Sequence, residues 1–273
     1  MTTVGFIGLG SQGGPMARRI VEAGIDTVLW ARRPQTLEPF ADTAAKTAGS
    51  PAELGAAGDI VCLCVVGDDD VRSVATGPDG VLAGMREGTV LVVHSTVHPD
   101  TCAGLATEAA GRRVSVVDAP VSGGGRAAQA GALLVMVGGD DEPVTECLPV
   151  FGTYGDPVVH LGPLGSGQVT KLLNNLLFTA NLATSADTLA LGRSLGVDAE
   201  RLAQVITAGS ANSFALERVA SAGGSLDRIA GHAGNVLLKD VGLIDGIVSG
   251  AHVHSAVVQA TAHATLRLMG LER

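Results

Sequence analysis

The sequence has few aromatic residues, few cysteines and no cluster of positive charge. Only 3% of its 273 residues are Phe, Trp or Tyr, so the core must be built from closely packed Ala, Val, Leu and Ile. Lys and Arg number 18 against 27 Asp and Glu, which gives a formal net charge of −9. Nucleic-acid binding needs clustered cations that neutralise phosphates, so this balance argues against a nucleic-acid partner.

Metal and redox chemistry also have little support. The four cysteines are Cys62, Cys64, Cys102 and Cys147. They include no CxxC pair, and the first two fall in an apolar run typical of a buried strand. The closest histidine pair, His252 and His254, has no acidic or thiol neighbours in sequence. We therefore expect no metal site.

Long apolar runs and a basic leader are missing as well. No run approaches the ~20 apolar residues that are needed to span a bilayer. The N-terminus enters an apolar stretch almost at once, without a cleavage signal. These features predict a cytoplasmic protein with no membrane partner.

What the sequence does contain is glycine, with 38 residues, and a 46% hydrophobic content, which suffices for two domains. Short β-branched runs alternate with Ala-rich, helix-like stretches, a pattern typical of repeated βαβ units. The predicted strands are Val4–Leu9, Thr27–Trp30, Ile60–Val66, Val90–Val93, Val114–Asp118, Leu133–Val137 and Val158–Leu161. Several are apolar at consecutive positions, which indicates a mostly parallel sheet with helices on both faces.

After Leu161 the pattern changes. A cluster of Gly and Pro is followed by a stretch from Gln168 to Leu195 that fits one long helix. Further helices are predicted at Leu202–Ala208, Phe214–Ala220 and Val236–Ser249. The fold class is therefore α/β: a Rossmann-type N-terminal domain of residues 1–164 and an all-α C-terminal domain of residues 165–273.

The strongest motif is a GxGxxG turn that directly follows the first predicted strand. Gly8 permits the tight turn, Gly10 lets the backbone approach a pyrophosphate, and Gly13 lets the helix meet the sheet. The helix N-terminus then offers free N–H groups to the phosphates. We predict dinucleotide binding by Gly8, Leu9, Gly10, Ser11, Gln12 and Gly13.

The end of the second strand indicates which dinucleotide is bound. An acidic residue there would take the ribose 2′-hydroxyl of NAD, whereas this chain has Arg32 and Arg33. Guanidinium groups bind a 2′-phosphate, so NADP(H) is favoured over NAD(H). The alternative is that one or both arginines, Arg33 above all, are simply solvated.

A second glycine cluster, Ser122-Gly123-Gly124-Gly125, follows a strand that ends at Asp118. Open α/β sheets place their ligand crevice at this edge, and bare N–H groups with a serine hydroxyl suit a carboxylate. A flexible loop is the alternative. Farther along, Lys171 and Asn175 share one face of the long helix. A desolvated lysine there can shuttle an alcohol proton, although an ordinary solvated lysine fits the same pattern.

These motifs, in this order, resemble those of the β-hydroxyacid dehydrogenase family, which includes 3-hydroxyisobutyrate and 6-phosphogluconate dehydrogenases. Residues 6–17 resemble its cofactor signature, residues 118–124 its substrate motif DAPVSGG, and residues 165–175 its catalytic GxGxxxKxxNN. Ser95-Thr96 with Pro99 resembles the loop near the nicotinamide ribose. Lys239-Asp240 is similar to the pair whose lysine closes over the cofactor. The likeness covers nearly the whole chain.

The resemblance implies a reversible hydride transfer between NADP(H) and a small β-hydroxy carboxylate or its semialdehyde. Ser122, Gly123 and Gly124 would hold the carboxylate. Lys171 would act as acid in reduction and base in oxidation, and Asn175 would hold it in register with the substrate. The long helix is rich in Ala and Leu, so we also expect a homodimer or homotetramer.

The chain departs from the family pattern at several positions. Gln12 replaces the usual methionine, and Gly125-Arg126-Ala127 replaces a small-acidic run. Arg126 either binds a second acidic group of the substrate or faces solvent, and His232 is a candidate for the pocket lining. The chain also ends at Arg273, earlier than is usual, so we expect a terminal segment near the active site to be missing.

Two alternative functions remain open at this stage. Imine reductases share the architecture and use NADPH, but they generally lack a lysine at the position of Lys171. A non-catalytic NADP(H)-binding protein is the other alternative, suggested by the altered loop and the early chain end.

Overall fold

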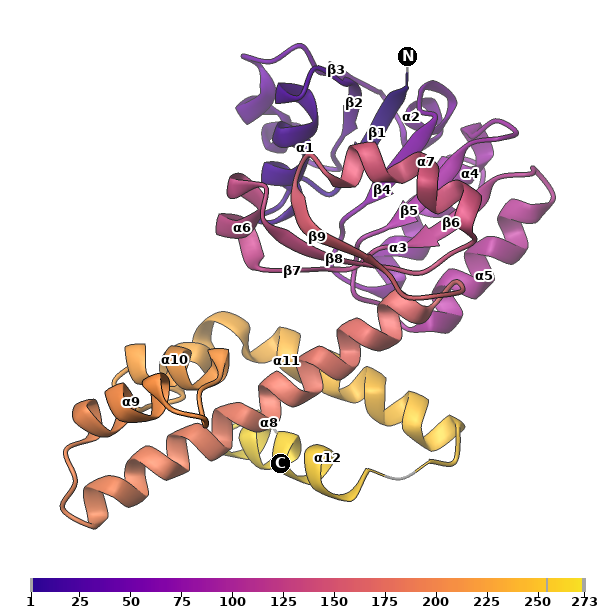
Figure 1. The fold of residues 1–273 in the computed structure, drawn as a ribbon. Helices are drawn as coiled ribbons and strands as arrows, with labels where there is room; N and C mark the ends of the chain where they lie inside the picture. Colours follow the sequence, from indigo (N-terminus) through magenta and orange to yellow (C-terminus); the bar gives the residue numbers. More distant parts are fainter. Residues whose placement is uncertain (1, 254, 272–273) are drawn as a thin grey trace. The chain divides into compact units, whose positions relative to one another are not determined.

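The computed structural model describes residues 2–253 and 255–271 (Figure 1). His254 of the histidine pair and the chain end at Arg273 lie outside these residues. The chain divides into two compact units, Met1–Lys171 and Leu172–Arg273. Their boundary falls inside one long helix, α8 (Ser166–Ser194), whose start lies close to the domain boundary expected from the sequence.

A parallel sheet forms the centre of the first unit, with strand order β3-β2-β1-β4-β5-β6. All five neighbouring pairs are parallel, which confirms the predicted sheet type. The strands are β1 (Thr3–Ile7), β2 (Asp26–Trp30), β3 (Lys46–Thr47), β4 (Ile60–Leu63), β5 (Val90–Val93) and β6 (Ser115–Asp118). This arrangement places the loops after β1, β2, β4, β5 and β6 at one edge of the sheet.

Helices cover both faces of this sheet. The neighbouring residues Phe6 and Ile7 point to opposite faces and are both buried, each in a separate hydrophobic cluster. The first-unit helices are α1 (Gly13–Glu22), η1 (Pro34–Phe40, a 3₁₀ helix), α2 (Pro51–Ala57), α3 (Asp68–Ala75), α4 (Val81–Gly84), α5 (Pro99–Ala110), α6 (Gly124–Ala130) and α7 (Asp141–Phe151). The consecutive apolar residues of the strands are explained by this double coverage.

The last predicted strands belong to a second, smaller sheet. It has the order β7-β8-β9, from β7 (Val121–Ser122), β8 (Leu133–Val137) and β9 (Gly155–His160). β7 is antiparallel to β8, while β8 is parallel to β9. β3 and β7 were not predicted, because strands of two residues carry no periodic signal.

One predicted strand is shorter than expected. The apolar run Ile60–Val66 continues past the sheet, but β4 ends at Leu63. Val66 is 79% exposed, and the Val65 N–H donates to Ser95 Oγ (2.8 Å) instead of to a strand. The end of the run is therefore a loop at the edge of the sheet where a ligand crevice is expected.

The second unit contains helices and, among the described residues, no strand. It consists of most of α8 together with α9 (Ala199–Ala208), α10 (Phe214–Ser221), α11 (Asp227–Gly250) and α12 (Ala256–Leu268). Asp198 and Ser213 cap α9 and α10, because their side chains accept backbone N–H groups of the first turn. The all-α prediction is confirmed, although α12 was missed and α11 starts earlier than predicted.

Two further findings on the described residues concern a membrane span and a metal site. None of the described helices is long and apolar enough to cross a membrane. The same residues hold no group of three or more His, Cys, Asp or Glu side chains able to hold a metal ion. Burial raises the pKa of the Cys147 thiol to about 12, so this cysteine stays protonated at neutral pH.

A buried imidazole lies beneath the edge of the sheet where the motifs converge. His94, at the end of β5, donates from Nδ1 to the carbonyl oxygen of Ala119 (2.6 Å). The Tyr154 hydroxyl donates to Nε2 (3.0 Å), and the rings of Phe6 and Phe151 lie against the imidazole. Because a carbonyl can only accept, the contact with Ala119 requires a proton on Nδ1, and burial lowers the pKa of His94 so that the ring is neutral at neutral pH.

His94 should therefore make the fold sensitive to acid. Burial lowers its pKa from 6.5 to about 4 in the folded chain, so on acidification the unfolded chain takes up the proton first. The stability that this group contributes is fully present above pH 6.5 and is lost as the pH falls toward about 4. In urea unfolding measured across that window, the wild type should lose more stability than His94→Gln, whose amide keeps a donor and an acceptor but cannot titrate. Parallel curves for the two proteins would contradict this assignment.

Candidate active site

The first glycine turn is shaped by contacts of backbone with backbone. Gly8 has φ +100°, and a Cβ there would overlap the Cys64 carbonyl. A Cβ on Gly13, the first residue of α1, would overlap the Gly8 carbonyl oxygen. Gly10 differs, because it is exposed and no heavy atom lies within 4 Å of its Cβ position. Packing requires Gly8 and Gly13, whereas Gly10 is exposed backbone that a ligand can approach.

The arginine pair lies just beyond β2. Arg32 and Arg33 are both exposed, and no acidic residue stands at the end of this strand. The Arg32 guanidinium Nη1 lies 3.8 Å from Oδ1 of Asp70, which belongs to the first turn of α3. The Arg32 side chain is 82% exposed, so it is accessible to an anion from solvent.

The loop after β5 contains Ser95, which is buried, and Thr96, which is half-buried. Ser95 Oγ accepts the Val65 N–H, so this loop is joined to the loop after β4. The buried side chain of Gln168 also binds here: its Oε1 accepts the Val97 N–H (3.0 Å) and its Nε2 donates to the Ser95 carbonyl (2.9 Å). Gln168 was not among the predicted site residues.

The second glycine cluster lies against the first. Gly123 and Gly124 adopt φ values of +130° and +70°, which bring the chain from β7 into α6. A Cβ on the next residue, Gly125, would stand 2.5 Å from the carbonyl oxygen of Ser11. The predicted substrate loop and the predicted cofactor turn are therefore in backbone contact. Ser122 is half-buried at the start of this loop.

Lys171 lies in the second turn of α8. It is only 8% exposed, which is uncommon for a lysine. The N-terminal turn of its helix, α8, is held by Asp118, the last residue of β6: Gly165 N–H donates to Oδ1 (2.6 Å) and Gln168 N–H donates to Oδ2 (2.7 Å). The alternative given by the sequence, an ordinary solvated lysine, does not fit this burial.

The predicted partner of Lys171 lies in the second unit. Asn175 donates from Nδ2 to Oδ2 of Asp240 (2.6 Å), and Asp240 is 2% exposed. Lys239 Nζ lies 3.3 Å from Asp240 Oδ1, as an ion pair without hydrogen-bond geometry. Asp240 was predicted only as a member of the Lys-Asp pair, without a role of its own. Its placement beside Asn175 joins two motifs that are far apart in the chain.

Two positions that differ from the family pattern are exposed. Arg126 lies in α6, two residues after the glycine pair, with its side chain accessible to solvent. His232 lies on α11 and donates from Nδ1 to the carbonyl of Arg228 (2.8 Å). Exposure leaves Arg126 able to meet an anionic group, whereas His232 is engaged with its own helix.

Comparison with known proteins gives the same family as the motifs. A model for the NAD-binding domain of 6-phosphogluconate dehydrogenase matches residues 3–162, and a model for NAD-binding of NADP-dependent 3-hydroxyisobutyrate dehydrogenase matches residues 165–270. The 2-(hydroxymethyl)glutarate dehydrogenase of Eubacterium barkeri is 34% identical over 241 residues, which are 88% of this chain and 80% of that protein. The chain belongs to the β-hydroxyacid dehydrogenase family.

Solved structures show that the likeness in fold covers almost the whole chain. Mycobacterium tuberculosis 3-hydroxyisobutyrate dehydrogenase, solved with L-serine, is similar with a TM-score of 0.87 and 26% identity, over 99% of this chain and 94% of that one. Psf3, solved with NADP⁺ and 2-OPP, is similar with a TM-score of 0.82 and 26% identity, over 97% of this chain and 93% of that one. An imine reductase from a Pseudomonas species shares the fold alone. Its TM-score is 0.66 and its identity 17%, over 98% of this chain and 92% of that one. The dehydrogenase is therefore an NAD(P)-dependent oxidoreductase.

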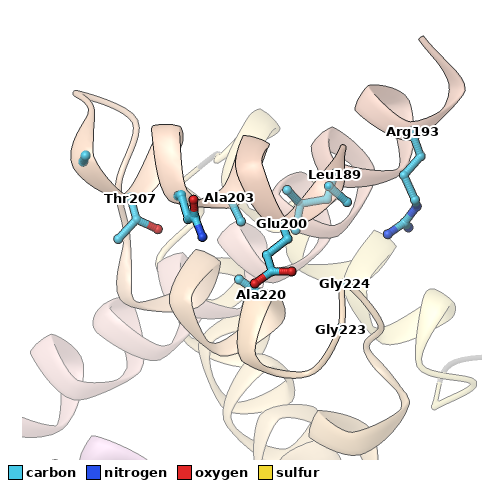
Figure 2. Close-up of a pocket in the computed structure, with 11 residues that line it drawn as sticks. Leu189, Arg193, Glu200, Ala203, Thr207, Ala220, Gly223 and Gly224 are labelled. Atoms are coloured by element: carbon cyan, nitrogen blue, oxygen red, sulfur yellow. The ribbon is translucent and has the colours of Figure 1, made fainter. Parts of the chain in front are cut away.

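One pocket in the second unit of the dehydrogenase lies apart from the predicted site residues. It has a volume of about 680 Å³ and lies among α8, α9 and α10, where Leu189, Arg193 and Glu200 face it (Figure 2). None of the predicted cofactor, substrate or catalytic residues lines it. The motif residues, and not the size of this pocket, therefore identify the candidate active site.

The different roles of two glycines can be separated by experiment. Gly13→Ala should be destabilised by about 1–3 kcal/mol, because its Cβ overlaps the Gly8 carbonyl. Gly10→Ala has room within the protein and should keep wild-type stability, but bind NADPH and NADH about 10-fold more weakly, because the pyrophosphate can no longer approach the backbone. Thermal unfolding and cofactor titration measure the two effects. Wild-type cofactor affinity in Gly10→Ala would refute the placement of the pyrophosphate.

Proposed function

We propose that the dehydrogenase transfers hydride between NADP(H) and a small β-hydroxy carboxylate or its semialdehyde, with Lys171 as general acid and base. The observation that carries this proposal is the burial of Lys171 in a helix whose first turn is bonded to the base of the glycine-rich loop. A desolvated lysine next to that loop suits proton transfer to a bound alcohol or carbonyl oxygen.

The proposed division of labour follows the family resemblance of the motifs. Residues 1–164 bind NADP(H) through the turn Gly8–Gly13, with Thr96 near the ribose and Lys239 closing over the cofactor. Residues 165–273 provide active-site closure and the dimer contact. The nicotinamide, when bound, supplies or accepts the hydride at C4. Lys171 gives a proton to the substrate oxygen in reduction and takes it back in oxidation.

The substrate carboxylate is assigned to Ser122, Gly123 and Gly124. Gly123 and Gly124 are exposed and present bare backbone, and Ser122 adds a hydroxyl donor. L-Serine, present in the Mycobacterium tuberculosis structure, is itself a β-hydroxy carboxylate. Arg126 is proposed to meet a second acidic group, as a substrate like 2-(hydroxymethyl)glutarate would carry. Asn175, held by Asp240, keeps Lys171 and the substrate hydroxyl in register.

NADP(H) is the proposed cofactor because Arg32 follows β2 where NAD-specific enzymes have an acid. The exposed guanidinium is available to a 2′-phosphate, and an exposed pair with Asp70 at 3.8 Å competes only weakly. Arg33, exposed beside it, adds positive charge. The Psf3 structure, which holds NADP⁺, is consistent with this choice.

The experiment that tests the function is oxidation of NADPH, with NADH in parallel, against glyoxylate and succinic, tartronate and methylmalonate semialdehydes. We expect turnover with a preference for NADPH. Lys171→Ala should lower kcat by about 10²-fold or more while NADPH affinity stays close to wild type, because the proton donor is lost but the cofactor contacts remain.

Lys46→Ala is a matched control, since Lys46 is an exposed lysine in β3, and it should keep wild-type turnover. Retained turnover in Lys171→Ala would exclude the catalytic assignment. If the wild type turned over no compound of this panel but reduced cyclic imines, the imine reductase alternative would be favoured. Tight NADPH binding with neither activity would favour a non-catalytic role.

A homodimer through the second unit is the proposed assembly. Leu177, Leu191 and Leu195 of the α8 region are 56%, 57% and 73% exposed, and Val205 of α9 is 69% exposed. Large apolar side chains that are exposed in one chain are candidates for burial against a second copy. Light scattering at micromolar concentration should return at least twice the mass of one chain. A monomer mass would exclude this assembly.

A further inference from the structure

Asp118 is fully buried at the end of β6, and both of its carboxylate oxygens are engaged by one helix end. Its backbone exchanges hydrogen bonds with Gly138 in both directions (3.0 and 2.7 Å), so the position of the Asp118 backbone does not depend on the side chain. Its Oδ1 and Oδ2 accept the N–H groups of Gly165 and Gln168. The N–H groups of a first helical turn have no partner inside their helix, so Asp118 caps α8 from a distant strand.

The space around this carboxylate is too tight for the helix end to shift. A Cβ on Gly138 would overlap Asp118 Oδ1, and a Cβ on Gly167 would overlap the Met136 carbonyl and stand 2.7 Å from Asp118 Oδ2. Both glycines therefore allow the backbones to close on the carboxylate. The first turn of α8 is held by hydrogen bonds and by packing at once.

Charge reinforces the contact. Burial raises the pKa of Asp118 to about 6, and hydrogen bonds from the backbone N–H groups of Gly165, Gln168 and Gly167 oppose that rise. At neutral pH the side chain is therefore an anion at the positive end of a long helix, where an anion is favoured.

Gln168 joins the same helical turn to a third segment. Its side chain binds both the Val97 N–H and the Ser95 carbonyl in the loop that contains Thr96. One helical turn after Gln168 on the same helix stands Lys171. The substrate-loop strand, the cofactor-side loop and the lysine-bearing helix are thus bonded to one another through Asp118 and Gln168.

We propose that Asp118 is a positioning residue for the reaction: by capping α8 it sets where Lys171 stands relative to the substrate loop, and Gln168 sets the same turn relative to the cofactor-side loop. This inference rests on the proposed function for its catalytic consequence. A misplacement of about 1 Å at a reacting group lowers turnover by up to about 10²-fold, so the cap matters for rate and not only for stability.

Asp118→Asn tests this inference, because it keeps the shape of the side chain but removes its charge and one acceptor. We expect kcat to fall by about 10-fold or more while the KM for NADPH changes little, since the glycine turn is untouched. Amide hydrogen exchange over residues 165–171 should become faster. Activity is measured at a temperature where circular dichroism shows the variant folded.

Asp198→Asn is the matched control. Asp198 also caps a helix, α9, with its Oδ1 accepting the Arg201 N–H (2.9 Å), and the hydrogen bonds described for its side chain involve no predicted site residue. This variant should lose stability and keep wild-type kcat. Wild-type kcat in Asp118→Asn, or an equal loss of kcat in both variants, would overturn the proposal.

Gln168→Met is the second variant if Asp118→Asn does not fold. It removes both bonds to the cofactor-side loop at similar volume, and wild-type kcat in folded Gln168→Met would also overturn the proposal. If the wild type turned over no substrate of the panel, the proposed function would fail by itself. The hydrogen exchange of residues 165–171 would still decide, in Asp118→Asn against Asp198→Asn, whether Asp118 holds this turn.

Discussion

Contact of one backbone segment directly with another is the constraint on which the first unit depends. It occurs where Gly8 meets Cys64, where Gly13 meets Gly8, and where Gly125 meets Ser11. A Cβ at any of these glycines would overlap a carbonyl group, so the segments approach only because one partner has no side chain. Glycine is abundant in this chain, with 38 residues, and these three positions show where its lack of a side chain is needed.

These contacts bring the two glycine clusters to the same edge of the sheet. A second set of interactions then connects them to the helical segment that carries the lysine. Asp118 and Gln168 are both buried, and each makes hydrogen bonds across long sequence separations to backbone groups that would otherwise lack partners. Buried polar groups need such partners, and a fully bonded network of this kind also fixes the relative positions of the loops that it joins.

Much of this could be predicted from the sequence. The parallel sheet followed from apolar runs without alternation, and α8 followed from the long stretch after the Gly and Pro cluster of residues 162–167, although the helix begins inside that cluster, at Ser166. The two-residue strands and the end of β4 could not be predicted, because Val65 and Val66 are as apolar as the strand before them. Only the bond from Val65 to Ser95 shows that the chain has left the sheet.

The sequence by itself determined the family, the kind of fold and the candidate residues, because turn glycines, strand periodicity and the lysine motif are local patterns that can be read from neighbouring residues. Only the tertiary structure showed that Asp118 caps α8, that Gln168 bonds to Ser95 and Val97, and that Asp240 binds Asn175. The pairs Asp118 and Gly165, Ser95 and Gln168, and Asn175 and Asp240 are separated by 47, 73 and 65 positions in the chain. No local pattern encodes such pairings, because they form only when the fold brings distant strands, loops and helices within hydrogen-bond distance.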